Sequence, residues 1–335
     1  MIYNGITYDV GTEYLPNIFS RTGLNSSIVR SDMDAIKNQL HCTTVRVYGK
    51  DVQLLIMASE IALDSGLDVW ISPRLIDGNQ QDTLEYLKKV AIEYQVLKEK
   101  YPKRELVFIV GCEMTIDMNC FVRGATLNER AKNLLKPIFF IKNIFGIKQP
   151  YQASFNQFLE NAVETVLNEF MGKITYAAAI WEEVDWSIFD FISVNLYKAS
   201  FNATYYPKKI GQMVRLGKPF IVSEFGCCSY EGAHNKGPTG HYVLDYSKRP
   251  PVFKEKCIRD ETVQAEYITE LLDIYNREKV TGAFIFDFYS QRYVYNENPE
   301  KDLDMASYAI TKSTGENTWE PKESFRKVAE YFKNG

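Results

Sequence analysis

Two glutamates stand directly after apolar segments whose composition is typical of buried β-strands. Glu113 ends the run VFIVGCE, and Glu224 ends the run PFIVSE. A carboxylate at such a position is poorly hydrated unless it lines a cavity, and burial beside a like charge raises the pKa of one of the two groups. A carboxylic acid that protonates a leaving oxygen, paired with a carboxylate that attacks carbon or activates water, is what cleavage of a glycosidic bond requires. For either glutamate alone, a strand-end residue paired with Lys or Arg is the simpler interpretation.

Composition removes several other kinds of chemistry. The 335 residues include only 3 His, and no HxH or HExxH pattern occurs, which excludes the common zinc-hydrolase motifs. No glycine loop of the common phosphate-binding kinds is present, so nucleotide chemistry has no support. The formal net charge of −4 argues against a nucleic-acid-binding surface. We therefore expect neither a metal nor an organic cofactor.

The termini and the cysteines bear on location. No segment approaches 18 uncharged apolar residues, so no membrane-spanning helix is expected, and the opening MIYNGITYDVG lacks the regions of a signal peptide. The six Cys show no CxxC spacing, and a disulfide between the adjacent Cys227 and Cys228 would be strained. We therefore expect reduced thiols, a cytoplasmic protein and no membrane partner, with a secreted mature form as the alternative. Nothing in the sequence indicates the oligomeric state.

The elements that position the two carboxylates alternate between short apolar runs and amphipathic helical patterns, which is typical of parallel βα units. Strands are expected at residues 2–9, 43–48, 67–73, 105–113, 174–180, 191–197, 219–224 and 280–288, and helices at 52–64, 82–100, 127–145, 154–171, 260–279 and 321–332. This order predicts an α/β protein, a single (β/α)8 TIM barrel over residues 1–335. Long loops follow strands four, seven and eight, at residues 114–126, 225–259 and 289–320, on the face where such barrels carry active sites.

Four motifs placed on these strands resemble the clan of retaining (β/α)8 glycoside hydrolases, whose carboxylates follow strands four and seven. They are VRVYG at 45–49, VGCE at 110–113, FDFISVNLY at 189–197 and SEFG at 223–226. The resemblance implies hydrolysis of a β-linked sugar by double displacement. It implies that Glu224 is the nucleophile and Glu113 the acid/base, that Arg46 reaches toward the nucleophile, and that Tyr197 hydrogen-bonds it.

Two departures from the clan pattern bear on how the sugar is bound. The clan has an Asn before the acid/base that contacts the sugar 2-hydroxyl, whereas this chain has Cys112, a poor hydrogen-bond partner. The clan also has a Trp at the end of strand eight as a platform under the sugar. This chain has FIFDFYS there. We expect Tyr289 to stack in place of the Trp and Asp287 to replace a missing polar contact at the barrel mouth.

Three further side chains are candidate substrate contacts. Asn195 alternates with Tyr197 along strand six and therefore shares its inward face. Trp181 directly follows strand five and suits stacking on a sugar, with a packed lid over the barrel as the equal alternative. Asp9, at the end of strand one, suits either sugar hydroxyls or a turn cap before Gly11.

Two other functions are compatible with the sequence. A non-catalytic barrel that binds carbohydrate or a protein partner is favoured by Cys112 and by the missing Trp, and it predicts carboxyls that are far apart or blocked. A Schiff-base lyase would use Lys198, directly after strand six. Such a lysine needs burial or a cationic neighbour, and the sequence shows no such neighbour.

Overall fold

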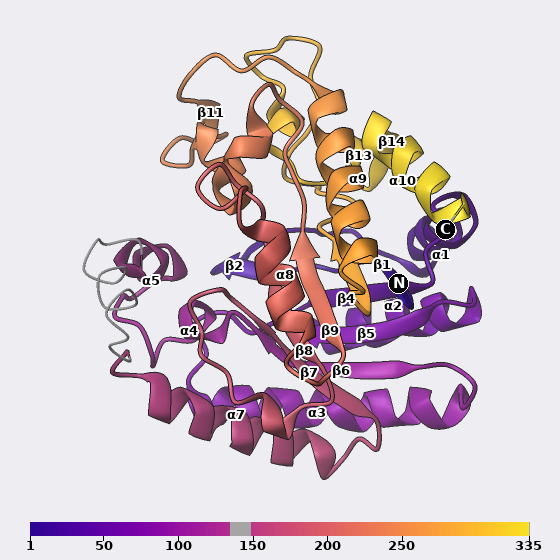
Figure 1. Cartoon of the computed structure of the whole chain (residues 1–335), viewed down its shortest axis with the longest axis vertical. Helices are drawn as coiled ribbons and strands as arrows, with labels where there is room; N and C mark the ends of the chain where they lie inside the picture. The colour runs from indigo at the N-terminus through magenta and orange to yellow at the C-terminus, as the bar shows by residue number, and fades with distance from the viewer. Residues whose placement is uncertain (135–148, 335) are drawn as a thin grey trace.

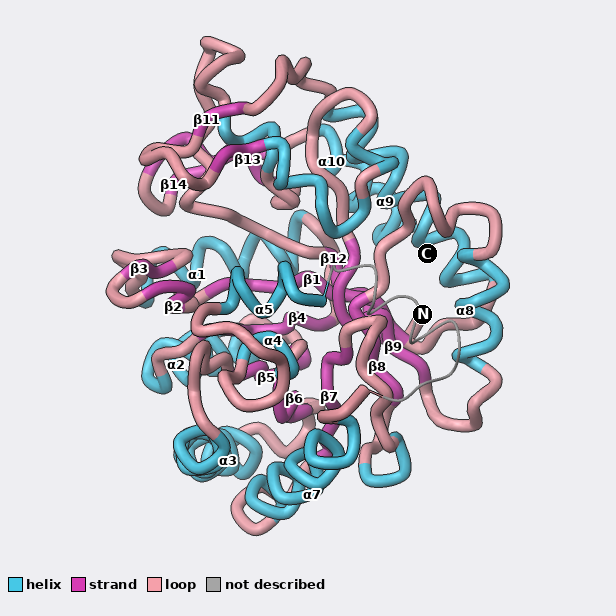
Figure 2. The backbone as a smooth tube through the Cα atoms, turned by 90° about the vertical axis from the view of Figure 1, so that its left-hand side faces the viewer, coloured by secondary structure: helices cyan, strands magenta, loops and turns pink. Residues whose placement is uncertain are grey.

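The computed structural model describes residues 1–134 and 149–334, and its centre is a closed barrel of eight parallel strands. Figure 2 shows the strands following one another around the ring in the order β1, β4, β5, β6, β7, β8, β9 and β12. They span Tyr3–Asp9, Thr44–Gly49, Asp68–Pro73, Leu106–Cys112, Lys173–Ala178, Ile192–Asn195, Phe220–Phe225 and Gly282–Ile285. The predicted (β/α)8 barrel is confirmed, although β8 and β12 end two and three residues earlier than the sequence pattern predicted.

Aromatic rings fill the part of the barrel where the strands begin. The Trp70 ring lies 4.9 Å from the ring of Phe191, 5.1 Å from that of Phe284 and 5.2 Å from that of Tyr3, between centroids. Gly5 makes room for this packing, since a Cβ there would lie 2.4 Å from the Phe284 ring.

Helices surround the ring of strands (Figure 2). Side chains of Asn25, Asp51, Asn79 and Asp260 accept hydrogen bonds from backbone N–H groups and cap four of these helices at their N-termini. The helices are α1 (Ser26–Asp34), α2 (Val52–Asp64), α3 (Gln80–Lys100), α7 (Gln152–Leu167), α8 (Tyr206–Val214), α9 (Glu261–Arg277) and α10 (Glu323–Asn334). The sequence pattern did not predict α1 or α8.

The connections after the strands carry short elements of their own. The hairpin β2 (Glu13–Leu15) and β3 (Ile18–Phe19) follows β1, and α4 (Met114–Asp117) and α5 (Leu127–Leu134) follow β6. The long connections after β9 and β12 carry the hairpins β10 (Leu244–Asp245) with β11 (Val252–Phe253) and β13 (Thr311–Gly315) with β14 (Thr318–Pro321). Figure 1 shows β2, α4, α5 and β11 on the same side of the molecule.

Two sequence predictions concern the helix expected at residues 127–145 and the absence of a membrane-spanning helix. The helix predicted at 127–145 begins as α5, and its residues 135–145 lie outside the described residues. Within residues 1–134 and 149–334, no helix is both long enough and apolar enough to cross a membrane.

Candidate active site

The Glu224 carboxylate lies on β9 and has a hydrogen-bond donor and a cation beside it. The Tyr197 hydroxyl, just beyond β8, donates to Glu224 Oε1 at 2.6 Å. Arg46 Nη1, on β4, lies 3.7 Å from Glu224 Oε2 and donates to the Ser223 carbonyl at 2.9 Å. The Glu224 side chain keeps 15% of its surface exposed. The carboxylate is thus held between a phenol donor and a guanidinium, and its residual exposure leaves it accessible.

Glu113 is the first residue after β6, and its backbone is left-handed, with φ 47° and ψ 39°. This region costs a residue with a side chain about 1 kcal/mol or more. Asn195 Nδ2 donates to Glu113 Oε1 at 2.9 Å, and Ser223 Oγ in turn donates to Asn195 Oδ1 at 2.9 Å. Burial, and after it the negative charge of Glu224, raise the pKa of Glu113 to about 8. At neutral pH this carboxyl therefore carries a proton.

A third carboxylate, Glu182, holds the segment that follows Glu113. Its Oε1 accepts from the Thr115 backbone N–H at 3.0 Å and from Thr115 Oγ1 at 2.7 Å. Its Oε2 accepts from the Tyr176 hydroxyl at 2.9 Å and from the Ala179 N–H at 2.8 Å. Burial raises the pKa of Glu182 to about 7 even though all four of these donors favour the charged form. Glu182 thus fixes the turn on which Glu113 stands.

Sequence reasoning missed Glu182, although a signal was present. Glu182 comes shortly after the strand-five run ITYAAAI, and a carboxylate after a buried strand is the criterion that singled out Glu113 and Glu224. The neighbouring Trp181 is partly buried, and its Nε1 donates to Thr115 Oγ1 at 3.1 Å. The structure therefore brings Trp181 to the same turn, and its stacking on a sugar stays a prediction.

The amide beside Glu113 comes from Asn195 rather than from residue 112. Cys112 is only 2% exposed, and its thiol lies 3.4 Å from Asn195 Nδ2. Burial raises the pKa of the Cys112 thiol to about 11, so it is not a thiolate at neutral pH. Asn195, on β8, thus supplies the side-chain amide next to the carboxyl, and Cys112 packs against that amide.

Two predicted substrate contacts have other partners in the structure. Tyr289 is 1% exposed, its ring packs on the Arg21 guanidinium at 4.7 Å, and its hydroxyl donates to the Gly315 carbonyl at 2.5 Å. The prediction that Tyr289 stacks on substrate is wrong, because its side chain is buried and its ring already packs on Arg21. Asp9 is buried and its Oδ1 accepts from the Gly11 N–H at 2.9 Å, the turn-capping arrangement that was one of its two interpretations.

Asp287 follows β12 and is buried at the mouth of the barrel, with 4% of its surface exposed. The Tyr48 hydroxyl lies 3.5 Å from Oδ2, at the limit of a hydrogen bond, and Oδ1 accepts none from the described residues. Burial, and after it the charge of Asp9, raise the pKa of Asp287 well above its usual range. Both effects disfavour the charged carboxylate at this position relative to an exposed aspartate.

Lys198 does not have the surroundings of a Schiff-base nucleophile. Its Nζ forms an ion pair with Glu270 on α9, whereas a Schiff-base lysine needs an apolar pocket or a cationic neighbour. For metals, no group of three or more His, Cys, Asp or Glu within the described ranges is arranged to hold an ion.

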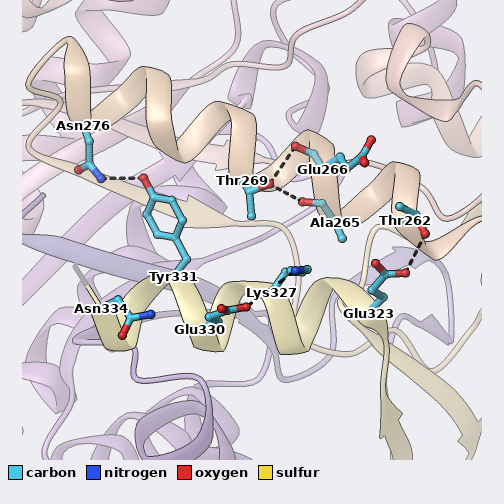
Figure 3. A pocket seen from close by; sticks show the side chains of 10 residues that line it. All are labelled: Thr262, Ala265, Glu266, Thr269, Asn276, Glu323, Lys327, Glu330, Tyr331 and Asn334. Carbon is cyan, nitrogen blue, oxygen red and sulfur yellow. Dashed lines mark hydrogen bonds and ion pairs between the residues drawn. The ribbon is translucent and has the colours of Figure 1, made fainter.

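A separate groove of about 750 Å³ lies between α9 and α10 (Figure 3). Its lining includes Thr262, whose hydroxyl donates to Glu323, and Asn276, which donates to Tyr331. None of the residues that line it belongs to the cluster around Glu113 and Glu224. We therefore assign the chemistry to the ends of the barrel strands rather than to this groove.

Comparison with known proteins places the fold. No protein-family profile and no curated protein sequence matches the chain. Among solved structures, it superposes on β-glucuronidase 2 of Bacteroides uniformis with a TM-score of 0.59 and 14% identity, over 99% of this chain and 35% of that one. The β-glucuronidase of Parabacteroides merdae gives 0.58 and 15%, over 99% and 36%. A β-glucosidase named 1317 gives 0.56 and 11%, over 100% and 99%.

These similarities show that the barrel has the (β/α)8 fold that these solved glycosidase structures also have. The chain spans about a third of the length of the two glucuronidases, and nearly the whole of the glucosidase. At identities of 11–15% the likeness defines the fold alone.

Proposed function

We propose that this protein is a glycoside hydrolase that cleaves a β-linked sugar with retention of configuration. The observation that carries the proposal is a pair of carboxyls with opposite surroundings. Glu224 accepts a hydrogen bond from Tyr197 and lies against the Arg46 guanidinium, while the pKa of Glu113 is raised to about 8 by burial and by Glu224. One acid that is protonated and one carboxylate that is charged at the same pH are what double displacement needs.

In the first step, Glu224 Oε attacks the anomeric carbon while the bond from that carbon to the leaving oxygen breaks. Glu113 transfers its proton to that oxygen, so the leaving group departs as a neutral alcohol. In the second step, the Glu113 carboxylate takes a proton from water, and the water oxygen displaces Glu224 from the sugar. Asn195 contributes by orienting Glu113, since its amide donates to Oε1. This route uses neither a metal nor an organic cofactor.

The names of the structural neighbours support the β-linkage and a carbohydrate substrate. They include two β-glucuronidases and a β-glucosidase, and the B. uniformis enzyme is described as covalently bound to an aziridine. The partial exposure of Glu224 and the influence of its charge on Glu113 argue against the alternative of a non-catalytic barrel, which predicted distant or blocked carboxyls.

The proposal is tested with 4-nitrophenyl β-glycosides of glucose, galactose and glucuronic acid. We expect hydrolysis of at least one of them, with the β-anomer as the first product seen by proton NMR. Glu224→Gln abolishes turnover, whereas Glu93→Gln, at an exposed position on α3, leaves it unchanged. Full activity of Glu224→Gln, or an α-anomer as first product, would refute the mechanism.

A further inference from the structure

Tyr308, on the connection after β12, packs against the tyrosine that holds the candidate nucleophile. Its ring centroid lies 5.8 Å from that of Tyr197, with the two ring planes 72° apart, and only 8% of Tyr308 is exposed. Tyr197 is the residue whose hydroxyl donates to Glu224 Oε1. Because aromatic pairs prefer a defined geometry, this edge-on contact limits how the Tyr197 ring can turn.

The Tyr308 hydroxyl holds a turn of the connection after β9 against the same tyrosine. It donates to the Gly237 carbonyl at 2.6 Å and accepts from the Gly240 N–H at 2.9 Å. A Cβ on Gly237 would lie 3.6 Å from Tyr197 Cβ and 2.9 Å from Ala199 Cβ, so this turn packs closely on the segment that carries Tyr197. Tyr308 therefore acts on Tyr197 in two ways, through its own ring and through the turn that its hydroxyl fixes.

The backbone of Tyr308 is anchored by helix α9. Gln264 is fully buried, and its Nε2 donates to the Tyr308 carbonyl at 3.2 Å and to the Cys227 carbonyl at 2.6 Å. Ser324 Oγ donates to Gln264 Oε1 at 2.7 Å, so both the nitrogen and the oxygen of this amide have partners. One side chain of α9 thus ties the connections after β9 and β12 together and fixes the point from which the Tyr308 ring extends.

We propose that Tyr308 is a positioning residue, which holds the Tyr197 phenol in the orientation that donates to Glu224. The inference rests on the proposed function, in which Glu224 must present a carboxylate oxygen to the anomeric carbon. The two hydrogen bonds of the Tyr308 hydroxyl go to Gly237 and Gly240 rather than to Glu224, and its ring contacts Tyr197. Replacing Tyr308 should therefore affect the nucleophile only while Tyr197 has a hydroxyl to place.

The first experiment detects the hydrogen bond itself and needs no turnover. In proton NMR, the Tyr197 hydroxyl proton is expected as a slowly exchanging downfield signal, assigned by its loss in Tyr197→Phe. Tyr308→Phe keeps the ring contact and frees the turn, so exchange of this proton with water is expected to be faster than in the wild type. Tyr308→Leu removes the ring as well and is expected to abolish the signal.

The matched control for this experiment is Tyr94→Leu. Tyr94, on α3, is another fully buried tyrosine whose hydroxyl donates to a backbone carbonyl, that of Val69, at 2.8 Å. Its replacement by Leu therefore carries a similar loss of buried contacts at a place away from the candidate site. We expect the Tyr197 signal and its exchange rate to be unchanged in this variant.

The second experiment measures hydrolysis of a 4-nitrophenyl β-glycoside that the wild type cleaves. Tyr308→Leu is expected to lower kcat roughly 2- to 10-fold, the range that an aromatic pair contact accounts for, with KM little changed. In the Tyr197→Phe background, the same substitution is expected to change kcat by less than about 2-fold, because residues that act through one another have non-additive effects.

The NMR outcome decides the inference separately from the proposed hydrolysis. Faster exchange in Tyr308→Phe and loss of the signal in Tyr308→Leu support the positioning role even if the wild type hydrolyses no glycoside. The role is overturned if exchange in Tyr308→Phe equals that in the wild type, if Tyr94→Leu has the same effect, or if the wild type gives no such signal. An equal loss of kcat from Tyr308→Leu with and without the Tyr197 hydroxyl also overturns it, whereas a wild type without hydrolase activity overturns only the proposed function.

Discussion

Replacing Glu224 by Gln tests whether the two carboxyls act on one another. The substitution removes one negative charge and keeps the shape of the side chain. Two unit charges about 5.5 Å apart, the separation expected for a retaining pair, interact by about 3 kcal/mol at an effective dielectric constant of about 20. Since a change of one in a pKa corresponds to 1.36 kcal/mol, the charge of Glu224 raises the pKa of Glu113 by about 2. We therefore expect the pKa of Glu113 to fall from about 8 to about 6.

The pKa of Glu113 is expected to stay above its ordinary value of 4.5, because burial is the larger cause and remains in the variant. The assay is a carbon-13 NMR titration of side-chain-labelled glutamate, with the Glu113 signal assigned by its loss in Glu113→Gln. Tyr197→Phe is the matched control, since it removes the hydrogen bond to Glu224 and keeps the charge. A Glu113 pKa that remains at about 8 in Glu224→Gln would refute the electrostatic pairing.

Three further predictions follow from the raised pKa values and from the turn after β6. The pKa of Glu113 is higher in the folded than in the unfolded protein, so the stability that its protonation contributes is present below about pH 4.5 and is lost as the pH rises through 8. In urea unfolding, the free energy of unfolding of the wild type should therefore fall relative to that of Glu113→Gln between pH 5 and pH 8. Parallel pH dependences of the two proteins would contradict this prediction. In Glu182→Gln, the side-chain amide offers one oxygen with two acceptor positions, whereas the Glu182 carboxylate accepts four hydrogen bonds. The substitution is expected to lower kcat and to reduce the free energy of unfolding by about 1–3 kcal/mol. An unchanged kcat would argue against the role of Glu182 in positioning Glu113. Asp287→Asn removes a buried carboxyl whose raised pKa makes its charged form unfavourable in the folded protein. The substitution is therefore expected to increase the melting temperature at pH 8 more than at pH 4. A melting temperature that decreases at pH 8 only would show that the folded protein stabilises the charged form.

The barrel was predictable because several of its strands are apolar on both faces. Runs such as ITYAAAI and PFIVSE contain no alternation, and a buried parallel strand is the structure that fits them. The places of Glu113 and Glu224 followed from the ends of those runs. The helices α1 and α8 were missed because each is only nine residues long, so each shows few repeats of the helical pattern.

The fine structure of the site depended on contacts between distant segments. Tyr289 is covered by Gly315 and Arg21, and nothing local to FIFDFYS signals either partner. The contact of Asn195 with Glu113 depends on the pairing of β8 with its neighbours and on the left-handed backbone at residue 113. Glu182, in contrast, could have been predicted from the sequence, because it follows a buried strand closely, as Glu113 and Glu224 do.

The covalent intermediate tests the central claim most directly. The protein is incubated with 2-deoxy-2-fluoro-β-glycosyl fluorides of the sugars it hydrolyses, digested, and analysed by tandem mass spectrometry. The expected result is a single fluoroglycosyl group esterified to Glu224, within the segment FIVSEF of β9. A label on another residue, or no label on a protein that hydrolyses the parent β-glycosides, would contradict the assignment of Glu224 as the nucleophile.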